Sequence, residues 1–338
     1  MWEKNLFEIW YKKKWPIISF FLLPLSALYY LCWKILDLYY NLFYHPKDLK
    51  CPVISVGNIT VGGTGKTPFI IYLIEFFLRR NIKNIVVLTR GYKAKKLGYI
   101  QGIEGEPDEA MFIKKRFPDV VVLANPNRYR IFSEYFSDRV LPQVVILDDG
   151  FQHRKLKRNL NIVMIDGSLK FGNGFLLPAG PLREPAISID KRADIVVIKN
   201  LQSETKIYFE RPTFNFNYHK LVIWDKNYIE VSIDKLLNRK TIAFCGIANP
   251  DSFKNILIGN RLILENFFAF PDHYRYTKKD LEDLTNNNCD YYLTTEKDWI
   301  KISNIWPADK PIFIVIPEFI LSNEKEFERI IYEKIHFS

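Results

Sequence analysis

A glycine-rich string is the first part of this sequence whose residue types and spacing could do chemistry. The string GGTGKT at 62–67 follows a short apolar run at 52–56 and precedes an apolar stretch with helical spacing. A strand, a glycine-rich loop and a helix together form a phosphate-binding loop, because backbone N–H groups and the helix N-terminus converge on phosphate oxygens. Thr60 stands where the general pattern has a glycine, so this loop is a variant.

The chemistry of this loop assigns roles to its residues. Lys66 would supply a positive charge to the β- and γ-phosphates of a nucleotide, and the hydroxyl of Thr67 would ligate Mg²⁺. The residues expected to hold the nucleotide are Gly62, Gly63, Thr64, Gly65, Lys66 and Thr67.

Two adjacent carboxylates end a second apolar run. Asp148 and Asp149 follow the run QVVIL at 143–147. In a parallel sheet, the carboxyl ends of the strands line the crevice in which ligands bind. Acids there can hold Mg²⁺ directly or through water, whereas a single strand-end aspartate commonly caps the next turn. We therefore expect Asp148 and Asp149 to serve a metal that binds with the nucleotide.

The elements that must position these residues alternate along the chain. Strand-like apolar runs lie at 52–56, 85–89, 120–123, 144–147, 161–165 and 194–198, with helical or loop segments between them. This alternation predicts an α/β layered domain of the P-loop NTPase kind, with a mostly parallel sheet. Residues 213–232 predict a two-stranded connector. A smaller C-terminal α/β unit would follow, with strands near 241–245, 291–294 and 312–316 and a terminal helix from about 324.

The longest uncharged run, at 15–33, bears on localisation. Pro24 interrupts it, lysines flank it, and aromatic residues cluster toward its ends, as they do at membrane interfaces. A transmembrane span, a helix lying in the interface and a buried core helix all remain open. The lysines at 12–14 would hold the N-terminus in the cytoplasm, and a single crossing would then place the nucleotide domain where there is no ATP. We therefore favour a kinked helix seated in the cytoplasmic leaflet, with its lysines at anionic headgroups.

The composition limits the possible classes of function. The chain has 48 Lys+Arg against 38 Asp+Glu, a formal net charge of +10, and 48% hydrophobic residues. Such a chain can bury a full core, which excludes disordered and collagen-like classes. The positive charge favours an anionic partner, which could be a polyanion, an anionic membrane or a phosphorylated small molecule. The 4 cysteines have no metal-ligand spacing and fit a reducing compartment.

Further strings occur in a fixed order along the chain. They are SVGN at 55–58, RGY at 90–92, DDGFQH at 148–153, FGNG at 171–174, LPAGPLREP at 177–185, FCGIANP at 244–250, DHY at 272–274 and TTEKD at 294–298. Together with the loop at 62–68, this ordered set resembles the tetraacyldisaccharide 4′-kinase family, the lipid A 4′-kinases, over about residues 1–300. Unrelated P-loop proteins share only the loop and the acidic strand.

The resemblance implies an activity and a location. Members of that family use ATP and Mg²⁺ to phosphorylate the 4′-hydroxyl of a tetraacylated glucosamine disaccharide 1-phosphate, on the cytoplasmic face of the Gram-negative inner membrane. We therefore expect four consecutive parts: a membrane-associated helix at 1–39, a kinase domain at 40–212, the connector at 213–232 and a C-terminal domain at 233–338. We also expect a monomer that binds a membrane glycolipid and no nucleic acid.

The catalytic acid of the family lies in a Gly-Asp-Glu-Pro string. Its nearest match is Pro107-Asp108-Glu109-Ala110, which keeps the two acids, and an alternative register would use Glu106. We prefer Asp108 as the base that accepts the proton of the sugar hydroxyl, because a helical stretch follows it. His273 could pair with Asp108, although a histidine beside aromatic residues is often a packed side chain.

The resemblance extends to the remaining site residues. Gln152 and Glu184 would complete or position the metal shell, and Asn249 would face the nucleotide. Arg90, Tyr92 and Arg128 are candidates for substrate contacts. The basic run at 154–158 could meet the 1-phosphate or lipid headgroups, but such runs are commonly solvated faces.

Three rival functions remain. A P-loop GTPase or metallochaperone would need an Asn-Lys-x-Asp string, and the nearest match, at 198–201, lacks both the Asn and the Asp. A nucleic-acid-dependent ATPase would bind DNA or RNA in a salt-sensitive way, and no recognition motif supports it. A membrane-anchored scaffold would show no turnover.

Overall fold

The computed structural model describes residues 10–11, 17–91, 96–103, 105–200, 208–247, 249–272, 274–287 and 289–335. The chain divides into two compact units. Unit 1 comprises Met1–Asn217 and Leu321–Ser338, and unit 2 comprises Tyr218–Ile320. Strand β8 (Thr213–Trp224) begins in unit 1 and continues in unit 2.

Unit 1 is built on a mostly parallel sheet. Its strands are β1 (Val53–Gly57), β2 (Ile85–Thr89), β3 (Gly98–Tyr99), β4 (Val121–Ala124), β5 (Val144–Asp148), β6 (Leu160–Asp166), β7 (Ile195–Lys199) and the start of β8. Their order is β8-β7-β6-β1-β5-β2-β4-β3, and within it only β3 pairs antiparallel with its neighbour. β1, β2, β5 and β6 are buried along their whole length, as expected for parallel strands covered on both faces. The predicted fold class is confirmed.

Helices of unit 1 connect these strands. They are α4 (Lys66–Arg79), α5 (Asp108–Arg116), α6 (Arg128–Tyr135) and α7 (Ile187–Arg192), with α11 (Glu324–Lys334) at the end of the chain. The ring of Phe327 on α11 is fully buried and packs edge-on against Phe69 and Phe76 of α4. Arg80 donates two hydrogen bonds to Glu328, at 2.6 and 2.7 Å. These contacts place α11 in unit 1, which differs from the C-terminal domain expected at 233–338.

Unit 2 contains the rest of the sheet, and its strands pair in parallel. Its strands, in spatial order, are β11 (Ile263–Ala269), β10 (Lys240–Cys245), β12 (Tyr291–Thr295) and β13 (Ile312–Leu321). Helices α8 (Pro250–Gly259), α9 (Lys278–Thr285) and α10 (Glu296–Ile302) pack with it, and a 3-10 turn at Ile233–Lys235 precedes it. β8 pairs antiparallel with β9 (Glu230–Val231) through a turn at 225–228, close to the turn expected in the connector.

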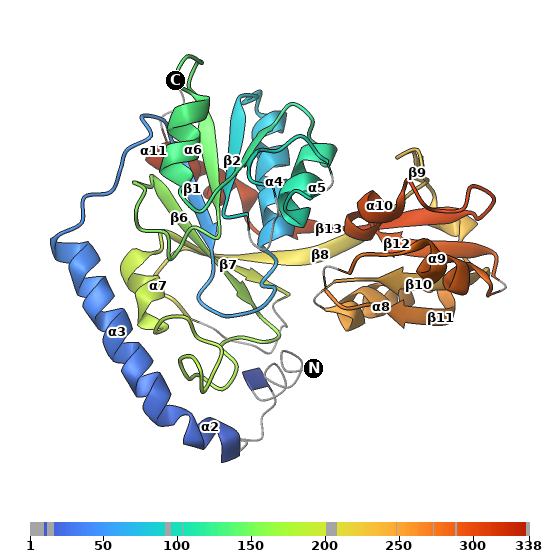
Figure 1. Ribbon diagram of the computed structural model, residues 1–338, viewed down its shortest axis with the longest axis horizontal. Coiled ribbons are helices and arrows are strands. Elements are labelled where there is room, and N and C mark those ends of the chain that lie inside the picture. Colours follow the sequence, from blue (N-terminus) through green and yellow to red (C-terminus); the bar gives the residue numbers. More distant parts are fainter. Residues whose placement is uncertain are drawn as a thin grey trace. The chain divides into compact units, whose positions relative to one another are not determined.

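The N-terminal apolar run forms two helices, α2 (Ile17–Phe21) and α3 (Leu23–Leu42), which follow one another as dark blue ribbons in Figure 1. Pro24 lies in the first turn of α3, where its missing N–H costs no hydrogen bond, so the run breaks at Leu22. Among the described residues, no helix has both the length and the apolar character needed to cross a bilayer. The alternative of a buried core helix is wrong, because most large apolar side chains of α3 are exposed.

Candidate active site

The phosphate loop joins β1 to α4. Gly62 and Gly65 have φ values of 119° and 85°, and Gly65 is the left-handed N-cap of α4. A Cβ on Gly65 would lie 2.4 Å from Cδ of Lys199, so this position also has no room for a side chain. Thr64 is 4% exposed, and its hydroxyl has no hydrogen-bond partner among the described residues. A buried donor without a partner, in a loop of this shape, suits a phosphate oxygen.

Lys66 lies at the first position of α4, and two oxygen atoms hold its ammonium group. Its Nζ donates to Oδ1 of Asn58 at 3.2 Å and lies 3.3 Å from Oδ1 of Asp149. Asn58 is fully buried, and its amide donates to the carbonyl oxygen of Thr60 at 2.8 Å. Asn58 therefore links the end of β1 to the loop lysine, a role that the sequence did not reveal although the residue stands in the SVGN string.

The two carboxylates at the end of β5 differ in environment. Asp149 has φ 49°, and besides Lys66 it meets the guanidinium of Arg183 at 3.3 Å. Burial acts to raise the pKa of Asp149, but the charges of Lys66 and Arg183 outweigh it and hold the pKa below its ordinary value. Asp148 accepts a hydrogen bond from the hydroxyl of Thr89 at 3.2 Å. Burial, and next to it the charge of Glu109, raise the pKa of Asp148 to about 7.

Glu109 is a member of this site to which the sequence assigned no role. It lies in the first turn of α5, directly after Asp108. The negative charge of its carboxylate raises the pKa of Asp148. Two neighbouring carboxylates repel each other, and a divalent cation relieves that repulsion. The pair of acids in the string at 107–110 was the signal that could have identified Glu109.

The alternative base, Glu106, is used elsewhere. Its side chain is buried, and its carboxylate accepts three backbone N–H hydrogen bonds, from Gln101 at 2.9 Å, Gly102 at 2.8 Å and Ile103 at 2.9 Å. Glu106 therefore shapes the loop that precedes α5. Asp108 is partly exposed at the start of that helix.

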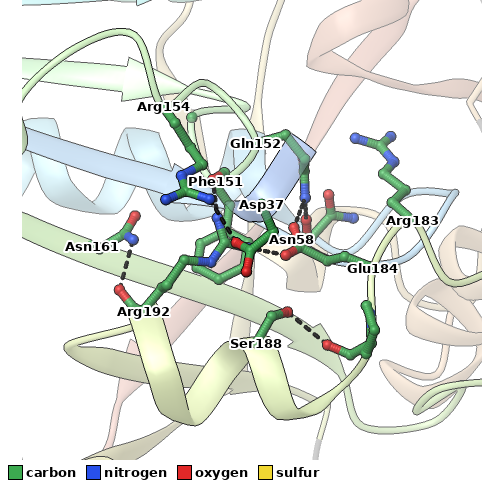
Figure 2. A network of polar contacts seen from close by, with 12 residues as sticks. Asp37, Asn58, Phe151, Gln152, Arg154, Asn161, Arg183, Glu184, Ser188 and Arg192 are labelled. Carbon is green, nitrogen blue, oxygen red and sulfur yellow. Dashed lines mark hydrogen bonds and ion pairs between the residues drawn. The ribbon is translucent and has the colours of Figure 1, made fainter. Parts of the chain in front are cut away.

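Gln152 and Glu184, both predicted for the metal shell, lie together in the network that Figure 2 shows. Nε2 of Gln152 donates to Oε1 of Glu184 at 2.7 Å and to the carbonyl oxygen of Asn58 at 2.8 Å. The second carboxylate oxygen of Glu184, which is 1% exposed, pairs with Arg192. In this arrangement the pair braces the strand that leads to the phosphate loop.

Arg90 and Arg128 belong to one cluster of positive charge. Burial and then the charges of Arg128, Lys155, Arg158 and Arg90 lower the pKa of His153 to about 3. Arg128 is only 3% exposed, and its guanidinium donates to the carbonyl oxygen of Asp148 at 2.8 Å. Arg128 therefore supports the end of β5, and its contact with the substrate stays a prediction.

The basic run at 154–158 is likewise engaged within unit 1. Arg154 pairs with Asp37 of α3 at 2.6 Å, as Figure 2 shows, and Lys157 pairs with Asp48 at 3.1 Å. These ion pairs hold α3 and the segment after it against the loop that follows β5. Arg154 and Lys157 therefore have a structural role, whereas in the sequence they were candidates for contact with a phosphate or lipid headgroups.

Tyr92 and His273 lie outside the described residues. Asn249 is in unit 2, where its side chain caps α8 by accepting the N–H of Ser252 at 3.1 Å.

The donors that could hold Mg²⁺ are oxygen atoms. The described part of the chain contains no ready-made group of three or more His, Cys, Asp or Glu side chains for a metal ion. The hydroxyl of Thr67 and the carboxylates of Asp148 and Asp149 instead resemble the set with which Mg²⁺ binds, in which one or two carboxylates are completed by other oxygen atoms, water and nucleotide phosphates. Burial is the main cause of the raised pKa of Asp148, and the charge of Glu109, next in size, is one that a bound cation would offset.

Comparison with known proteins agrees with this geometry. A family model described as tetraacyldisaccharide-1-P 4′-kinase matches residues 18–336. The tetraacyldisaccharide 4′-kinase of Aquifex aeolicus is 36% identical over 325 residues, covering 92% of this chain and 97% of that protein. The enzyme of the same name from Wigglesworthia glossinidia brevipalpis is 36% identical over 309 residues, covering 87% and 79%.

A solved structure is similar as well. The crystal structure of LpxK from Aquifex aeolicus in complex with ATP has a TM-score of 0.79 and 35% identity, and the match covers 94% of this chain and 100% of that one. The matched family model and these relatives span almost the whole sequence, including the phosphate loop and the acids of β5. This chain therefore belongs to the tetraacyldisaccharide 4′-kinase family.

Proposed function

We propose that this protein is an ATP-dependent kinase that transfers the γ-phosphate to the 4′-hydroxyl of tetraacyldisaccharide 1-phosphate in lipid A biosynthesis. The observation that carries the proposal is the meeting of Lys66 with Asp149, at 3.3 Å, in a chain of this family. It joins the phosphate loop to the strand-end acids, and phosphoryl transfer needs both.

Phosphoryl transfer asks the protein mainly for positioning and for neutralisation of charge. The loop amides and Lys66 hold the β- and γ-phosphates, and the unpartnered hydroxyl of Thr64 is a further donor. Thr67 and Asp149 would hold Mg²⁺, with Asp148 in support, and the ion would supply positive charge that neutralises the phosphates. Arg183, beside Asp149, adds positive charge at the same place.

Asp108 is the proposed general base for the 4′-hydroxyl. Its position at the start of α5, next to Glu109 and therefore near Asp148, supports this role. The engagement of Glu106 with three backbone N–H groups disfavours the alternative register. His273 is the proposed partner of Asp108, and Asn249 is a proposed contact to the nucleotide.

We further propose that α2 and α3 seat the enzyme on the cytoplasmic surface of the inner membrane. The side chains of α3 that point inward include the polar residues Ser26, Tyr29 and Asp37, and each makes a contact to the rest of unit 1. Most outward positions are apolar, with Lys34 and Asn41 as the exposed polar exceptions. The apolar positions include Leu25, Leu28, Leu31, Ile35, Leu36, Leu38 and Leu42, all more than half exposed.

A helix in water has the opposite pattern, with its apolar side inward. A contiguous apolar face of this kind suits the interface of a lipid bilayer, where the acylated substrate also lies. ATP is a cytoplasmic nucleotide, which assigns the face of the membrane. The proposed working form is a monomer, which sedimentation of the detergent-solubilised chain checks.

The decisive experiment incubates the protein with tetraacyldisaccharide 1-phosphate, Mg²⁺ and γ-labelled ATP in detergent. The expected product carries the label at the 4′-oxygen of the sugar, with GTP a poor substitute. Label released only as inorganic phosphate, or faster turnover of GTP than of ATP, would contradict the proposal and favour the rival NTPase.

A further inference from the structure

A segment at 176–183 lies directly against the phosphate loop. The N–H of Val61 donates to the carbonyl oxygen of Pro181 at 2.8 Å, and the N–H of Arg183 donates to that of Ile59 at 2.7 Å. Backbone hydrogen bonds on both sides of Thr60 make this segment a support for the loop, because a shift of one moves the other.

The same segment is held from its other side by α3. The hydroxyl of Ser26 donates to the carbonyl oxygen of Leu176 at 2.9 Å and accepts the N–H of Ala179 at 3.0 Å. The hydroxyl of Tyr29 donates to the carbonyl oxygen of Arg183 at 2.7 Å. Burial raises the pKa of Tyr29, so the hydroxyl keeps its proton at neutral pH.

Arg183 connects these contacts to the reacting groups. Its backbone takes the hydrogen bond from Tyr29, while its guanidinium lies 3.3 Å from Asp149. Two contacts therefore lead from the apolar-faced helix to the carboxylate that pairs with Lys66.

The described residues before α2 add a second hold on the loop. The hydroxyl of Tyr11 donates to the carbonyl oxygen of Val61 at 2.8 Å, next to Gly62. The carbonyl oxygen of Trp10 accepts the N–H of Asn173 at 2.8 Å. The N-terminal part of the chain thus contacts the phosphate loop directly as well as through 176–183.

We propose that Ser26 and Tyr29 are positioning residues that transmit the seating of α3 on a lipid surface to Arg183 and the phosphate loop. The inference rests on the membrane seating proposed above. In water, the exposed apolar face of α3 favours alternative packing of that helix, whereas a lipid surface covers the face and holds α3 where these hydroxyls reach their acceptors. Nucleotide affinity therefore rises when the enzyme is on the membrane.

The test measures the Kd of Mg·ATP for the full-length chain with and without vesicles that contain anionic phospholipid, in the absence of the disaccharide. We expect vesicles to lower the Kd of the wild type by about fivefold, the effect of one well-formed hydrogen bond. Tyr29→Phe and Ser26→Ala should lose this gain and yet co-sediment with vesicles as the wild type does. Tyr30→Phe, on the exposed side of the same helix, is the matched control and should keep the gain.

Equal gains in Tyr29→Phe and Tyr30→Phe would overturn the proposal, and so would a wild-type Kd that does not respond to vesicles. A variant that loses vesicle binding or thermal stability along with the gain would assign Tyr29 a structural role instead, and Tyr11→Phe then serves as the second variant. Because no sugar acceptor is present, these outcomes are independent of the 4′-transfer assay that tests the proposed function.

Discussion

The ammonium group of Lys66 lies 3.3 Å from Oδ1 of Asp149, so the phosphate loop and the end of β5 are joined by an ion pair. The guanidinium of Arg183 neutralises the same carboxylate. Nucleotide phosphates offer Lys66 a stronger set of acceptors than one carboxylate does. Binding of ATP can therefore turn the lysine toward the phosphates and leave Asp149 for Mg²⁺.

Replacement of Asp149 by Asn should therefore weaken the binding of Mg²⁺ more than it destabilises the fold. We expect the Mg²⁺ concentration for half-maximal rate to rise by about tenfold or more, because an amide is a poorer ligand than a carboxylate. Initial rates at fixed ATP and varied Mg²⁺ measure this. Asp138→Asn, at an exposed position, should leave the curve unchanged, and an unchanged curve for Asp149→Asn would remove Asp149 from the metal site.

Asp108 and Glu106 are distinguished by what each variant loses. Asp108→Asn should lower kcat by about 10²–10⁴-fold, the usual contribution of a general base, while the Kd of ATP stays near that of the wild type. Glu106→Gln should instead destabilise the turn that Glu106 forms with Gln101, Gly102 and Ile103 by about 1–3 kcal/mol, because it weakens three partly buried hydrogen bonds. Single-turnover rates and thermal unfolding separate the two. A greater loss of kcat in Glu106→Gln would reverse the assignment.

Much of unit 1 could be predicted because its strands are continuous apolar runs. The run at 85–89 is a strand with those same limits, and the others differ by one or two residues. β11, by contrast, is a largely exposed strand without such a run, and it was missed. The packing of α11 in unit 1 depends on the contact of Phe327 with aromatic rings of α4. This contact is long-range, and the local sequence pattern does not encode it.

The site divides in the same way. The phosphate loop and the acids of β5 could be predicted because local motifs carry their chemistry. The contacts of Asn58 and Arg183 could not, since strands and loops far apart in the sequence bring their partners to them. The bond from the buried guanidinium of Arg128 to the carbonyl oxygen of Asp148 is likewise a long-range contact that the sequence does not encode.

The exposed apolar face of α3 predicts that a charge placed on this face weakens membrane binding. Leu28→Glu and Leu31→Glu should each reduce co-sedimentation with vesicles by about tenfold, because a charge replaces an apolar side chain that would enter the interface. Ile258→Glu is the matched control, since this residue of α8 in unit 2 is 52% exposed, close to the 54% of Leu31. Equal losses in all three variants would show that net charge and not the α3 face governs binding.

The contact between Arg80 and Glu328 predicts that the stability of the packing of α11 depends on pH. The hydrogen bond from Arg80 holds the pKa of Glu328 below its ordinary value of 4.5. The native state therefore binds the proton less readily than the unfolded state. The stabilisation is complete well above pH 4.5 and is lost as the pH falls through the lowered pKa.

Glu328→Gln should accordingly speed hydrogen exchange of α11 amides at pH 7 by about fivefold, corresponding to about 1 kcal/mol for a partly exposed bidentate pair. The ratio of variant to wild type should approach one below the lowered pKa. Glu333→Gln, whose partner Arg329 lies on α11 itself, should change exchange little at either pH. A ratio for Glu328→Gln that does not depend on pH would contradict the ion pair as the cause.

The close packing around Gly57, the last residue of β1, predicts that the strand leading to the phosphate loop tolerates no added side chain at this position. A Cβ at this position would lie 2.6 Å from both the Cβ and the backbone nitrogen of Phe151, in the segment that follows the acids of β5. Neither atom can move without displacing β5, so Gly57→Ala should destabilise unit 1 by about 1–3 kcal/mol and raise the KM for ATP. In Gly259→Ala the new Cβ meets no atom within 4 Å, and this change at the end of α8 should be neutral or slightly stabilising. Urea unfolding together with ATP kinetics checks both, and equal behaviour of the two variants would show that β1 and β5 can separate without loss of the site.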